Sequence, residues 1–435
     1  MGWKHDTYTG WGRALRAEGD IARPERQSAL ARLTEQDPAP AIGSRRSYGD
    51  ACLNDGGRVV DMTRLDRVLA FDPTTGDLTV EAGVRLGALA ELFAPRGWLP
   101  AVMPGTGFAT VGGAIAMDVH GKNHHHAGTF GQHVREITLD QNGSKVTCAP
   151  GDTLFEATVG GMGQTGIIVQ AVLRLSQCKG DVMMVTERRV EDWEEHIALL
   201  DASEATYTVG WIDATARGAS LGRGILEEGE TAAGLIPKPK PARKVPMDAP
   251  GFALSPPIVR LFNAAYYRRV PASGRTVVKP IQDFFFPLDK LHDWNRLYGK
   301  RGFHQFQCVV PLAEVGRLRE MLEEIVQAGT ASPLAVLKRM GAGRAGLMSF
   351  PMEGYTLAVD FPARSDAEGL IAQLEEMTRA AGGRIYLAKD SLAQAEAVKS
   401  MYPDHARWAE ICNAADPDRA LETTLTRRLK LRETA

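Results

Sequence analysis

The hydrophobic positions of the chain recur with two different spacings. Leu86, Leu89 and Phe93 are spaced as on one face of a helix, and Gly97 is the expected end of that helix. Elsewhere, β-branched and aromatic residues form short runs bounded by glycine or proline, which is typical of strands. These runs predict strands over residues 58–61, 78–82, 135–139, 145–148, 167–175, 206–212, 284–287, 306–311 and 355–361. Further helices are expected over residues 110–119, 189–200, 315–328 and 367–381, and Asp416 and Pro417 are expected to begin a last helix with Leu421, Leu425 and Leu429 on one face.

The distribution of glycine divides the chain. Glycines gather in three clusters, at residues 43–57, 105–113 and 160–166, and become sparser after about residue 178. Short strands with interspersed helices before that point predict one α+β domain, and strand–helix alternation after it predicts a second, built on an antiparallel sheet. Residues 227–257 combine glutamates with Pro-Lys-Pro-Lys-Pro and Pro-Pro segments. We expect a mobile loop or lid there, with a plain solvated insertion as the alternative.

Composition narrows the class of protein. The 435 residues are enough for two domains, and the net charge of -2 lacks the basic surplus of a nucleic-acid-binding protein. The longest apolar runs fall well short of the roughly 18 residues of a membrane span. The N-terminus lacks the apolar core of a signal peptide, and the five scattered cysteines contain no CxxC pair. We therefore expect a cytoplasmic protein of enzyme size with reduced, buried thiols.

The stretch from residue 102 to residue 130 carries the clearest chemistry. Its glycines let the backbone approach a bulky ligand and leave amides free for phosphate oxygens, although an ordinary glycine-rich loop has the same composition. The third glycine of GxGxxG and the GxxxxGK[ST] pattern are both missing, which argues against a Rossmann site and a P-loop. Three separate glycine clusters instead suit an extended dinucleotide. The adjacent histidines at 124–126 lack the ligand spacing of a zinc site, so no metal is expected.

Several segments resemble the FAD-linked oxidoreductases of the vanillyl-alcohol-oxidase type. The matching segments are residues 43–50 (GSRRSYGD), 103–106 (MPGT), 110–113 (TVGG), 118–124 (DVHGKNH), 161–166 (GMGQTG), 210–213 (GWID), 286–289 (FPLD), 349–351 (SFP), 386–391 (YLAKDS) and 401–403 (MYP). The resemblance extends over nearly the whole chain. It implies an α+β architecture with a two-subdomain FAD-binding domain at residues 1–177 and 384–435. It also implies a substrate-binding domain at residues 178–383, with an antiparallel sheet and flanking helices.

The resemblance implies that the glycine clusters hold FAD. Relatives with covalent flavin carry a histidine where this chain has Arg46, so non-covalent FAD is expected, and an arginine there can pair with a phosphate. The implied cofactor-binding residues are Ala41, Ile42, Gly43, Ser44, Arg45, Arg46, Ser47, Tyr48, Gly49, Asp50, Ala51, Gly105, Thr110, Val111, Gly112, Gly113, Met117, Asp118, Val119, His120, Ile168 and Tyr386.

The resemblance also implies oxidation of an alcohol, in which a hydride leaves carbon for the flavin and a base takes the hydroxyl proton. Lys389 is the expected contact of the reacting hydroxyl, and burial that lowers its pKa would make it the base. The alternative for Lys389 is a surface lysine beside Asp390. The expected catalytic residues are Lys389, His120, Lys122 and Gln307, and the expected substrate-pocket residues are Trp211, Gln305, Lys338 and Ala358, with Lys338 facing a phosphate.

Three pocket positions depart from the pattern of mycobacterial relatives. Ala358 stands in place of a cysteine, Thr356 in place of an asparagine, and Phe285 where a tyrosine is common. Without that cysteine, no thiol is expected at this position for capture by activated inhibitors, whereas hydride transfer does not require one. The differing pocket walls leave open a difference in the lipid or sugar accepted.

Within this family the resemblance is to enzymes of lipid-linked pentoses. It implies oxidation of a polyprenylphosphoryl-β-D-ribose at the 2′-hydroxyl to the 2-keto sugar, the first half of epimerisation to the arabinose lipid for cell-wall arabinan, with a short-chain reductase as partner. FAD-dependent oxidation of a soluble sugar or alditol is one alternative, and a non-catalytic flavin-binding interaction protein is another. A lipid substrate implies peripheral membrane contact, for which Lys238, Lys240, Arg243, Lys244, Arg268 and Arg269 would attract anionic head groups.

Overall fold

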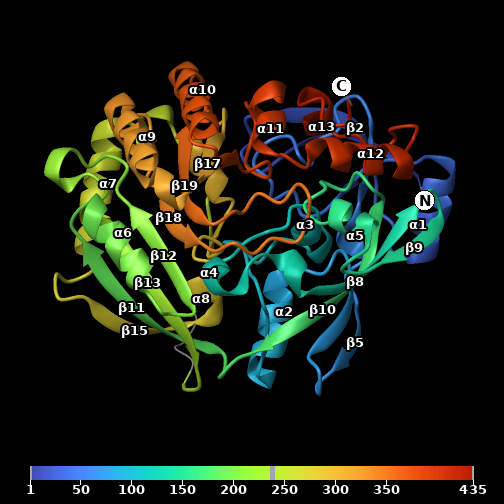
Figure 1. Cartoon of the computed structure of the whole chain (residues 1–435), viewed down its shortest axis with the longest axis horizontal. Coiled ribbons are helices and arrows are strands. Elements are labelled where there is room, and N and C mark those ends of the chain that lie inside the picture. Colours follow the sequence, from blue (N-terminus) through green and yellow to red (C-terminus); the bar gives the residue numbers. More distant parts are fainter. Residues whose placement is uncertain (1, 236–240, 434–435) are drawn as a thin grey trace.

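The computed structural model of the protein describes residues 2–235 and 241–433. The chain forms two halves that meet along a central seam (Figure 1). The N-terminal segment and the C-terminal helices lie together in one half, and the middle of the chain builds the other. This arrangement agrees with the predicted α+β class; the proposed domain limits, 1–177 with 384–435 against 178–383, remain a prediction.

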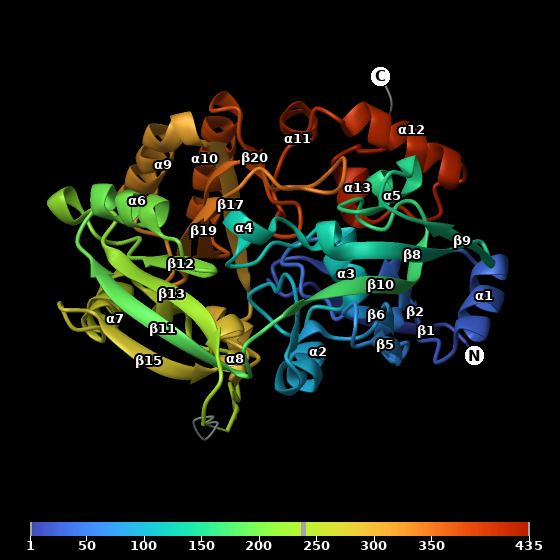
Figure 2. The ribbon, with the colours of Figure 1, turned by 60° about the horizontal axis from the view of Figure 1, so that its bottom comes forward.

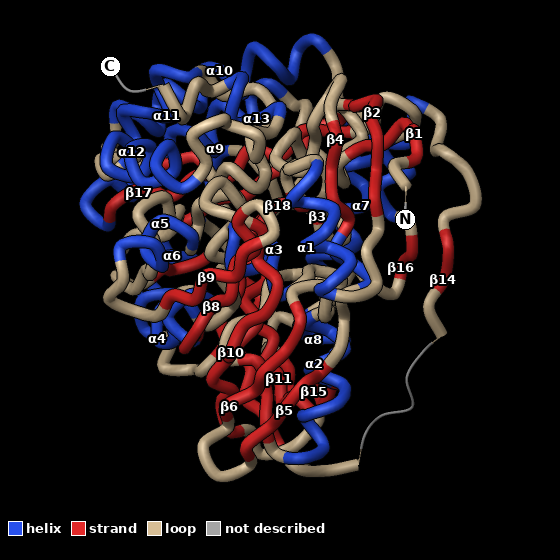
Figure 3. The backbone as a smooth tube through the Cα atoms, turned by 90° about the vertical axis from the view of Figure 1, so that its right-hand side faces the viewer, coloured by secondary structure: helices blue, strands red, loops and turns tan. Residues whose placement is uncertain are grey.

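The first half contains two sheets, which Figure 3 shows from the side. The smaller sheet has the strand order β1-β2-β4-β3, and the larger has the order β5-β6-β10-β8-β9 with β7 added to β10. Apolar side chains of α2 and α3 pack with those of the larger sheet in one core. The strands are β1 (Lys4–Thr9), β2 (Arg16–Ala22), β3 (Ala41–Ile42), β4 (Arg58–Asp61), β5 (Val68–Asp72), β6 (Asp77–Glu81), β7 (Trp98–Pro100), β8 (Val134–Gln141), β9 (Ser144–Cys148) and β10 (Ile167–Gln177).

The helices of this half include the short one that the glycine-rich stretch predicts. That helix, α3, begins after Thr110, whose hydroxyl accepts a hydrogen bond from the Gly113 amide at 3.2 Å. The C-terminal helices return to the same half, where Arg428 forms ion pairs with Asp50 and Asp390. The helices are α1 (Gln27–Gln36), α2 (Leu86–Phe93), α3 (Val111–Ala116), α4 (His124–Ala127), α5 (Thr153–Thr158), α11 (Ala395–Met401), α12 (His405–Ala415) and α13 (Thr424–Arg428).

The second half is built on one eight-stranded sheet in which every neighbouring pair is antiparallel, as predicted. Its order is β15-β11-β13-β12-β18-β19-β17-β20. The strands are β11 (Val182–Val190), β12 (Tyr207–Ile212), β13 (Gly224–Ala232), β15 (Arg275–Pro280), β17 (Phe303–Pro311), β18 (Ala335–Met340), β19 (Gly354–Pro362) and β20 (Arg384–Ile385), and a separate two-stranded pair is formed by β14 (Arg243–Lys244) and β16 (Leu291–His292).

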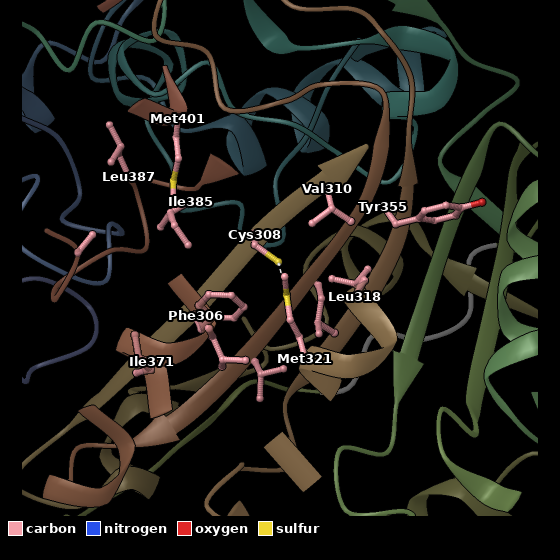
Figure 4. Close-up of a cluster of buried hydrophobic side chains, with 14 of the residues drawn as sticks. Phe306, Cys308, Val310, Leu318, Met321, Tyr355, Ile371, Ile385, Leu387 and Met401 are labelled. Atoms are coloured by element: carbon pink, nitrogen blue, oxygen red, sulfur yellow. Dashed lines mark hydrogen bonds between the residues drawn. The ribbon is translucent and has the colours of Figure 1, made fainter. Parts of the chain in front are cut away.

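Three helices, α6 (Trp193–Ala202), α9 (Val315–Ala328) and α10 (Ser365–Ala380), cover one face of this sheet (Figure 2). Residues at every second position of β17 and β19 enter the core beneath them, and Figure 4 shows Phe306, Cys308 and Val310 pointing toward Leu318 and Met321 of α9. The intervening residues of the same strands therefore face the opposite side, where the first half of the molecule lies.

Three local predictions are wrong, and one predicted helix is present with a later start. Residues 284–287 were expected as a strand, but α8 (Ile281–Phe285) is helical, and its two phenylalanines are buried together with Phe286 just after it. The predicted helix at 189–200 begins later, because β11 continues to Val190. The predicted loop at 227–257 contains the second half of β13, the strand β14 and the start of α7 (Pro256–Arg268). Asp416 begins no helix, because it follows α12 and pairs with the buried Arg432.

Candidate active site

A cavity of about 560 Å³ lies between the two halves, a size typical of small-molecule sites. Residues of all three glycine clusters line one part of it, and the face of the eight-stranded sheet opposite α6, α9 and α10 lines another. The cavity therefore joins the segments that the sequence analysis assigned separately to a cofactor and to a substrate.

Most of the predicted cofactor residues line this cavity. They include the loop after β3, the N-terminal turn of α3 and Ile168 of β10. The predicted residues that line it are Ala41, Ile42, Gly43, Ser44, Arg45, Arg46, Ser47, Tyr48, Ala51, Gly105, Thr110, Gly112, Gly113, Met117, Val119, His120, Ile168 and Tyr386.

Four predicted cofactor residues do not line the cavity, and each has another structural role. Asp50 is buried in its ion pair with Arg428, and Val111 lies in the core of the first half. Gly49 lies against the backbone of Asp390, so closely that an added Cβ would be 1.7 Å from its carbonyl oxygen. Asp118 accepts hydrogen bonds from the Gly131 amide at 2.8 Å and from Ser349, and so ties together loops behind the cavity.

The cavity fits an extended anionic cofactor. Among the described residues, the Ser44 hydroxyl and the Nε atom of Arg46 are buried without a hydrogen-bond partner, and buried polar groups normally have one. Arg46 lies between the rings of Trp11 and Phe108, at 3.9 and 4.4 Å from their centres. Burial lowers the pKa of Arg46 only to about 10, so it stays cationic. An added Cβ at Gly105 would meet open space, which leaves the backbone there accessible to a ligand.

The opposite part of the cavity is lined by residues of neighbouring strands whose side chains lie on the same face of the sheet. Gln305 and Gln307 come from β17, Lys338 from β18, and Ala358 from β19. Trp211 of β12 also lines it, and its indole N–H donates to the Pro333 carbonyl at 2.9 Å. All the predicted substrate-pocket residues are thus brought together at one wall.

Lys389 reaches the same region from the loop after β20. It lines the cavity, and its Nζ atom lies 3.3 Å from the centre of the Tyr48 ring. Burial lowers the pKa of Lys389 to about 7, and the nearby Asp360 opposes this while Lys338 adds to it. The surface-lysine alternative is therefore wrong, since the side chain faces a cavity and has a strongly lowered pKa.

Asp360 is the residue that the sequence analysis missed. It is fully buried, and it accepts hydrogen bonds from Gln305 and from the Tyr298 hydroxyl, the latter at 3.0 Å. Burial raises the pKa of Asp360 to about 7. Its position on β19, two residues after Ala358, was the available signal, because alternate residues of a strand share a face.

His120 and Gln307 form a second polar contact in the cavity. Gln307 donates through Nε2 to His120 Nε2 at 3.2 Å and also to the Thr356 hydroxyl at 3.3 Å. Burial, with Lys338 adding to it, holds the pKa of His120 well below its usual range, so the imidazole is neutral at pH 7. The ring also packs against Tyr386, with 5.2 Å between centres.

Lys122 and Lys338 bring two further amino groups to the cavity. Burial, with the charge of Lys122 adding to it, lowers the pKa of Lys338 to about 7. Burial also lowers the pKa of Lys122 to about 8, and its Nζ atom donates to the Phe284 carbonyl. Within residues 2–235 and 241–433, neither lysine has a salt-bridge partner, so the site offers positive charge to a ligand.

The histidine run forms the short helix α4 and binds to neighbouring backbone. His125 contacts the Ala205 carbonyl at 3.0 Å, and His124 accepts from the Gly341 amide at 3.1 Å. Over the described part of the chain, no group of three or more potential metal ligands comes together.

Comparison with known proteins agrees with this geometry. Residues 24–149 match the family model of the FAD binding domain. The chain is 36% identical to decaprenylphosphoryl-β-D-ribose oxidase of Mycolicibacterium smegmatis over 447 aligned positions, which cover 97% of each chain. It is 32% identical to an uncharacterised protein of Streptomyces coelicolor, over 80% of this chain and 100% of that one. A D-arabinono-1,4-lactone oxidase of Yarrowia lipolytica is 31% identical, over only 31% of this chain and 26% of that one.

Proposed function

The chain belongs to the decaprenylphosphoryl-β-D-ribose oxidase family of FAD-binding oxidoreductases, and on this premise we propose its reaction and its site. The protein oxidises the ribose 2′-hydroxyl of a polyprenylphosphoryl-β-D-ribose with FAD and forms the 2-keto sugar. Residues of the glycine clusters hold FAD, and the FAD is non-covalent because Arg46 stands where covalent relatives carry histidine.

One observation carries this proposal. Lys122, Lys338 and Lys389 line a single cavity, and Lys338 lies close enough to both of the others for the charges to act on one another. A soluble alditol has no anionic group to match this surplus of amino groups, whereas a phosphodiester-linked sugar does. The polar wall around Gln305 and Gln307 supplies donors and acceptors for sugar hydroxyls.

Bound FAD supplies the acceptor for the hydride that leaves the sugar carbon. The chain itself supplies the proton acceptor. Because the pKa of Lys389 is lowered to about 7, a large share of this residue is neutral at pH 7, and its amine can take the hydroxyl proton. The Tyr48 ring beneath Nζ and the charge of Asp360 favour the ammonium that results.

The remaining residues orient the sugar. Neutral His120 and Gln307 form a fixed pair that holds a sugar hydroxyl in place without adding charge beside the reacting carbon. Lys338 and Lys122 bind the phosphate, and an anion between them would raise the lowered pKa values of both.

The test is anaerobic reduction of the purified yellow protein with a synthetic polyprenylphosphoryl ribose. We expect the visible flavin band to bleach with this substrate and not with free ribose or free pentitols. Bleaching by pentitols but not by the lipid-linked sugar would favour the soluble-substrate alternative. No bleaching by any of them would leave a flavin-binding protein without this activity.

Epimerisation of the sugar requires a second reaction after the oxidation. A 2-keto sugar becomes the arabinose epimer only after reduction at the same carbon, so a short-chain reductase is the proposed partner. No helix among the described residues is long and apolar enough to cross a membrane. The proposed contact with the bilayer that holds the lipid-linked substrate is peripheral.

A further inference from the structure

The helix α7 presents an apolar stripe to solvent. Ile258, Leu261, Phe262 and Ala265 follow the i, i+3, i+4, i+7 spacing of one helix face, and all four are exposed. Leu261 is 74% exposed and Phe262 is 51% exposed. An amphipathic helix of a folded domain normally turns this stripe inward, so its outward direction requires an explanation.

The inward face of α7 is firmly attached: it buries Val259 and makes polar contacts. Asn263, which is fully buried, donates to the Asp213 carboxylate at 2.7 Å. Arg269, just after the helix, forms ion pairs with Glu187 and Glu227 at 3.0 and 3.2 Å. These contacts fix the orientation of the helix, so the outward apolar stripe is not the product of a loosely placed segment.

The apolar surface continues into the preceding segment. Met247 and Phe252 are each 69% exposed, and the turn at Gly251–Leu254 packs against α7. Five of the twelve exposed large hydrophobic side chains among the described residues lie within residues 247–262, a density that single scattered surface residues do not reach. Figures 1 and 2 place α7 on the outer side of the half built on the eight-stranded sheet.

Positive charge surrounds the same surface. Arg260 and Arg268 are exposed on α7, and Arg243 and Lys244 are exposed on β14. Two acidic residues of this region are paired: Asp248 with Arg13 and Arg296, and Asp293 with Lys244 at 3.5 Å, which leaves Arg243, Arg260 and Arg268 as the exposed cations. Of the other cations expected to meet head groups, Arg269 faces inward, and Lys238 and Lys240 lie outside the described residues.

The stripe is also connected to the cavity. The Phe262 ring stacks on Tyr266, with 5.9 Å between centres and 15° between planes. Tyr266 lines the cavity and lies edge-on to Trp211, with 4.7 Å between centres. One helix thus separates the substrate wall from the exposed apolar surface.

We propose that the outward face of α7, with Met247 and Phe252 beside it, docks this protein on the surface of a bilayer that contains anionic lipids. This inference rests on the proposed function, because a lipid-linked sugar is anchored in a bilayer by its prenyl chain. Apolar side chains enter the head-group region while the surrounding cations meet lipid phosphates, as in other interfacial helices. The sugar head then enters a cavity that is lined in part by Tyr266 on the inward side of the docked helix.

The experiment is co-sedimentation of the FAD-loaded full chain with vesicles of phosphatidylcholine and phosphatidylglycerol in equal parts, compared with pure phosphatidylcholine. We expect binding to the mixed vesicles that weakens with added salt. Leu261→Glu should weaken it about tenfold or more, since burial of a leucine supplies at least that factor. Leu92→Glu is the matched control, because Leu92 is an exposed leucine on α2 and should bind as the wild type does.

The turnover of a water-soluble short-chain prenylphosphoryl ribose separates this inference from the proposed function. We expect Leu261→Glu to turn over the short-chain substrate at the wild-type rate and to lose rate only on vesicle-embedded long-chain substrate. Wild-type protein that oxidises the short-chain substrate but does not bind mixed vesicles would overturn the docking proposal alone. A wild-type dimer that Leu261→Glu dissociates would also overturn it, because a second copy would then cover the stripe. Failure to oxidise either substrate, with vesicle binding intact, would count against the proposed function alone.

Discussion

The Nζ atom of Lys389 lies 3.3 Å from the centre of the Tyr48 ring. The two loops that carry these residues are also joined through their backbones, since the Tyr48 amide donates to the Ala388 carbonyl at 2.9 Å. The first glycine cluster therefore both borders the cofactor part of the cavity and fixes the position of the lysine. In the proposed mechanism, these two contacts link cofactor binding to proton transfer.

The pH dependence of flavin reduction should report the ionisation of Lys389. A base must be neutral to accept a proton, so the rate should rise as pH increases through about 7 and level off above it. Lys389→Ala should lose at least about a hundredfold of the rate while keeping its FAD. Stopped-flow reduction across pH measures both effects, and Lys179→Ala, at an exposed lysine, is the control. An unchanged rate in Lys389→Ala would show that another group takes the proton.

Asp360 should tune this ionisation without contacting the substrate. Its charge raises the pKa of Lys389, so Asp360→Asn should shift the rise in rate to lower pH. The asparagine keeps the size of the side chain and can still accept from Tyr298, which separates loss of charge from loss of packing. The pH profile of stopped-flow reduction measures the shift. A profile that stays in place while the rate falls would assign Asp360 a purely structural role.

Gly49 should be required for the position of Lys389. An added Cβ would lie 1.7 Å from the Asp390 carbonyl oxygen, so Gly49→Ala must push the two loops apart. We expect the rate of flavin reduction to fall by at least about tenfold, because small misplacements of a catalytic group greatly lower the rate. Gly369→Ala is the control, since nothing lies within 4 Å of its added Cβ. Equal rates for both variants would contradict the proposed link between the loops.

The cavity wall should become reactive to thiol reagents when Ala358 is replaced by cysteine. Ala358 lines the cavity, whereas the cavity's own Cys52 is buried and its pKa is raised to about 12, which keeps it as an unreactive thiol. Mass spectrometry should find one added label in Ala358→Cys and little in the wild type, with substrate protecting the new thiol. Equal labelling of the wild type would show that another of its cysteines is accessible.

The sequence predicted the residues of the site more completely than it predicted the local secondary structure. The strands around Gln307 and Ala358 have clear two-residue alternation, and so their cavity-facing residues could be inferred. Residues 284–286 look like a strand because three phenylalanines follow one another, but burial against neighbouring elements favours a helix there. The role of Gly49 depends on a contact with Asp390, and no local pattern encodes a contact between segments so far apart. The stripe on α7 was missed because no helix was predicted over residues 256–268, which follow the proline-rich segment assigned to a loop.

Lys338 should lower the stability of the folded protein and strengthen substrate binding. Its pKa falls from about 10.4 in an unfolded chain to about 7 in the fold, so the unfolded state binds more protons between these values. The loss of folding stability caused by burying the charged amino group is therefore greatest below about pH 7. It decreases as the pH rises and disappears above about pH 10. Lys338→Met removes the amino group and should raise the free energy of unfolding by about 1–3 kcal/mol at pH 7, with the gain over wild type vanishing near pH 10.

The same variant should bind the substrate poorly. Without the Lys338 amino group, the phosphate loses one of its two proposed partners, so KM should rise about tenfold or more while kcat changes less. Urea unfolding at pH 7 and pH 10 measures the first effect, and steady-state kinetics measures the second. A variant that is more stable but has an unchanged KM would mean that Lys338 does not meet the phosphate. A variant that is less stable at pH 7 would mean that the buried amino group has a partner in the folded protein, and the charge argument for this wall of the cavity would fail.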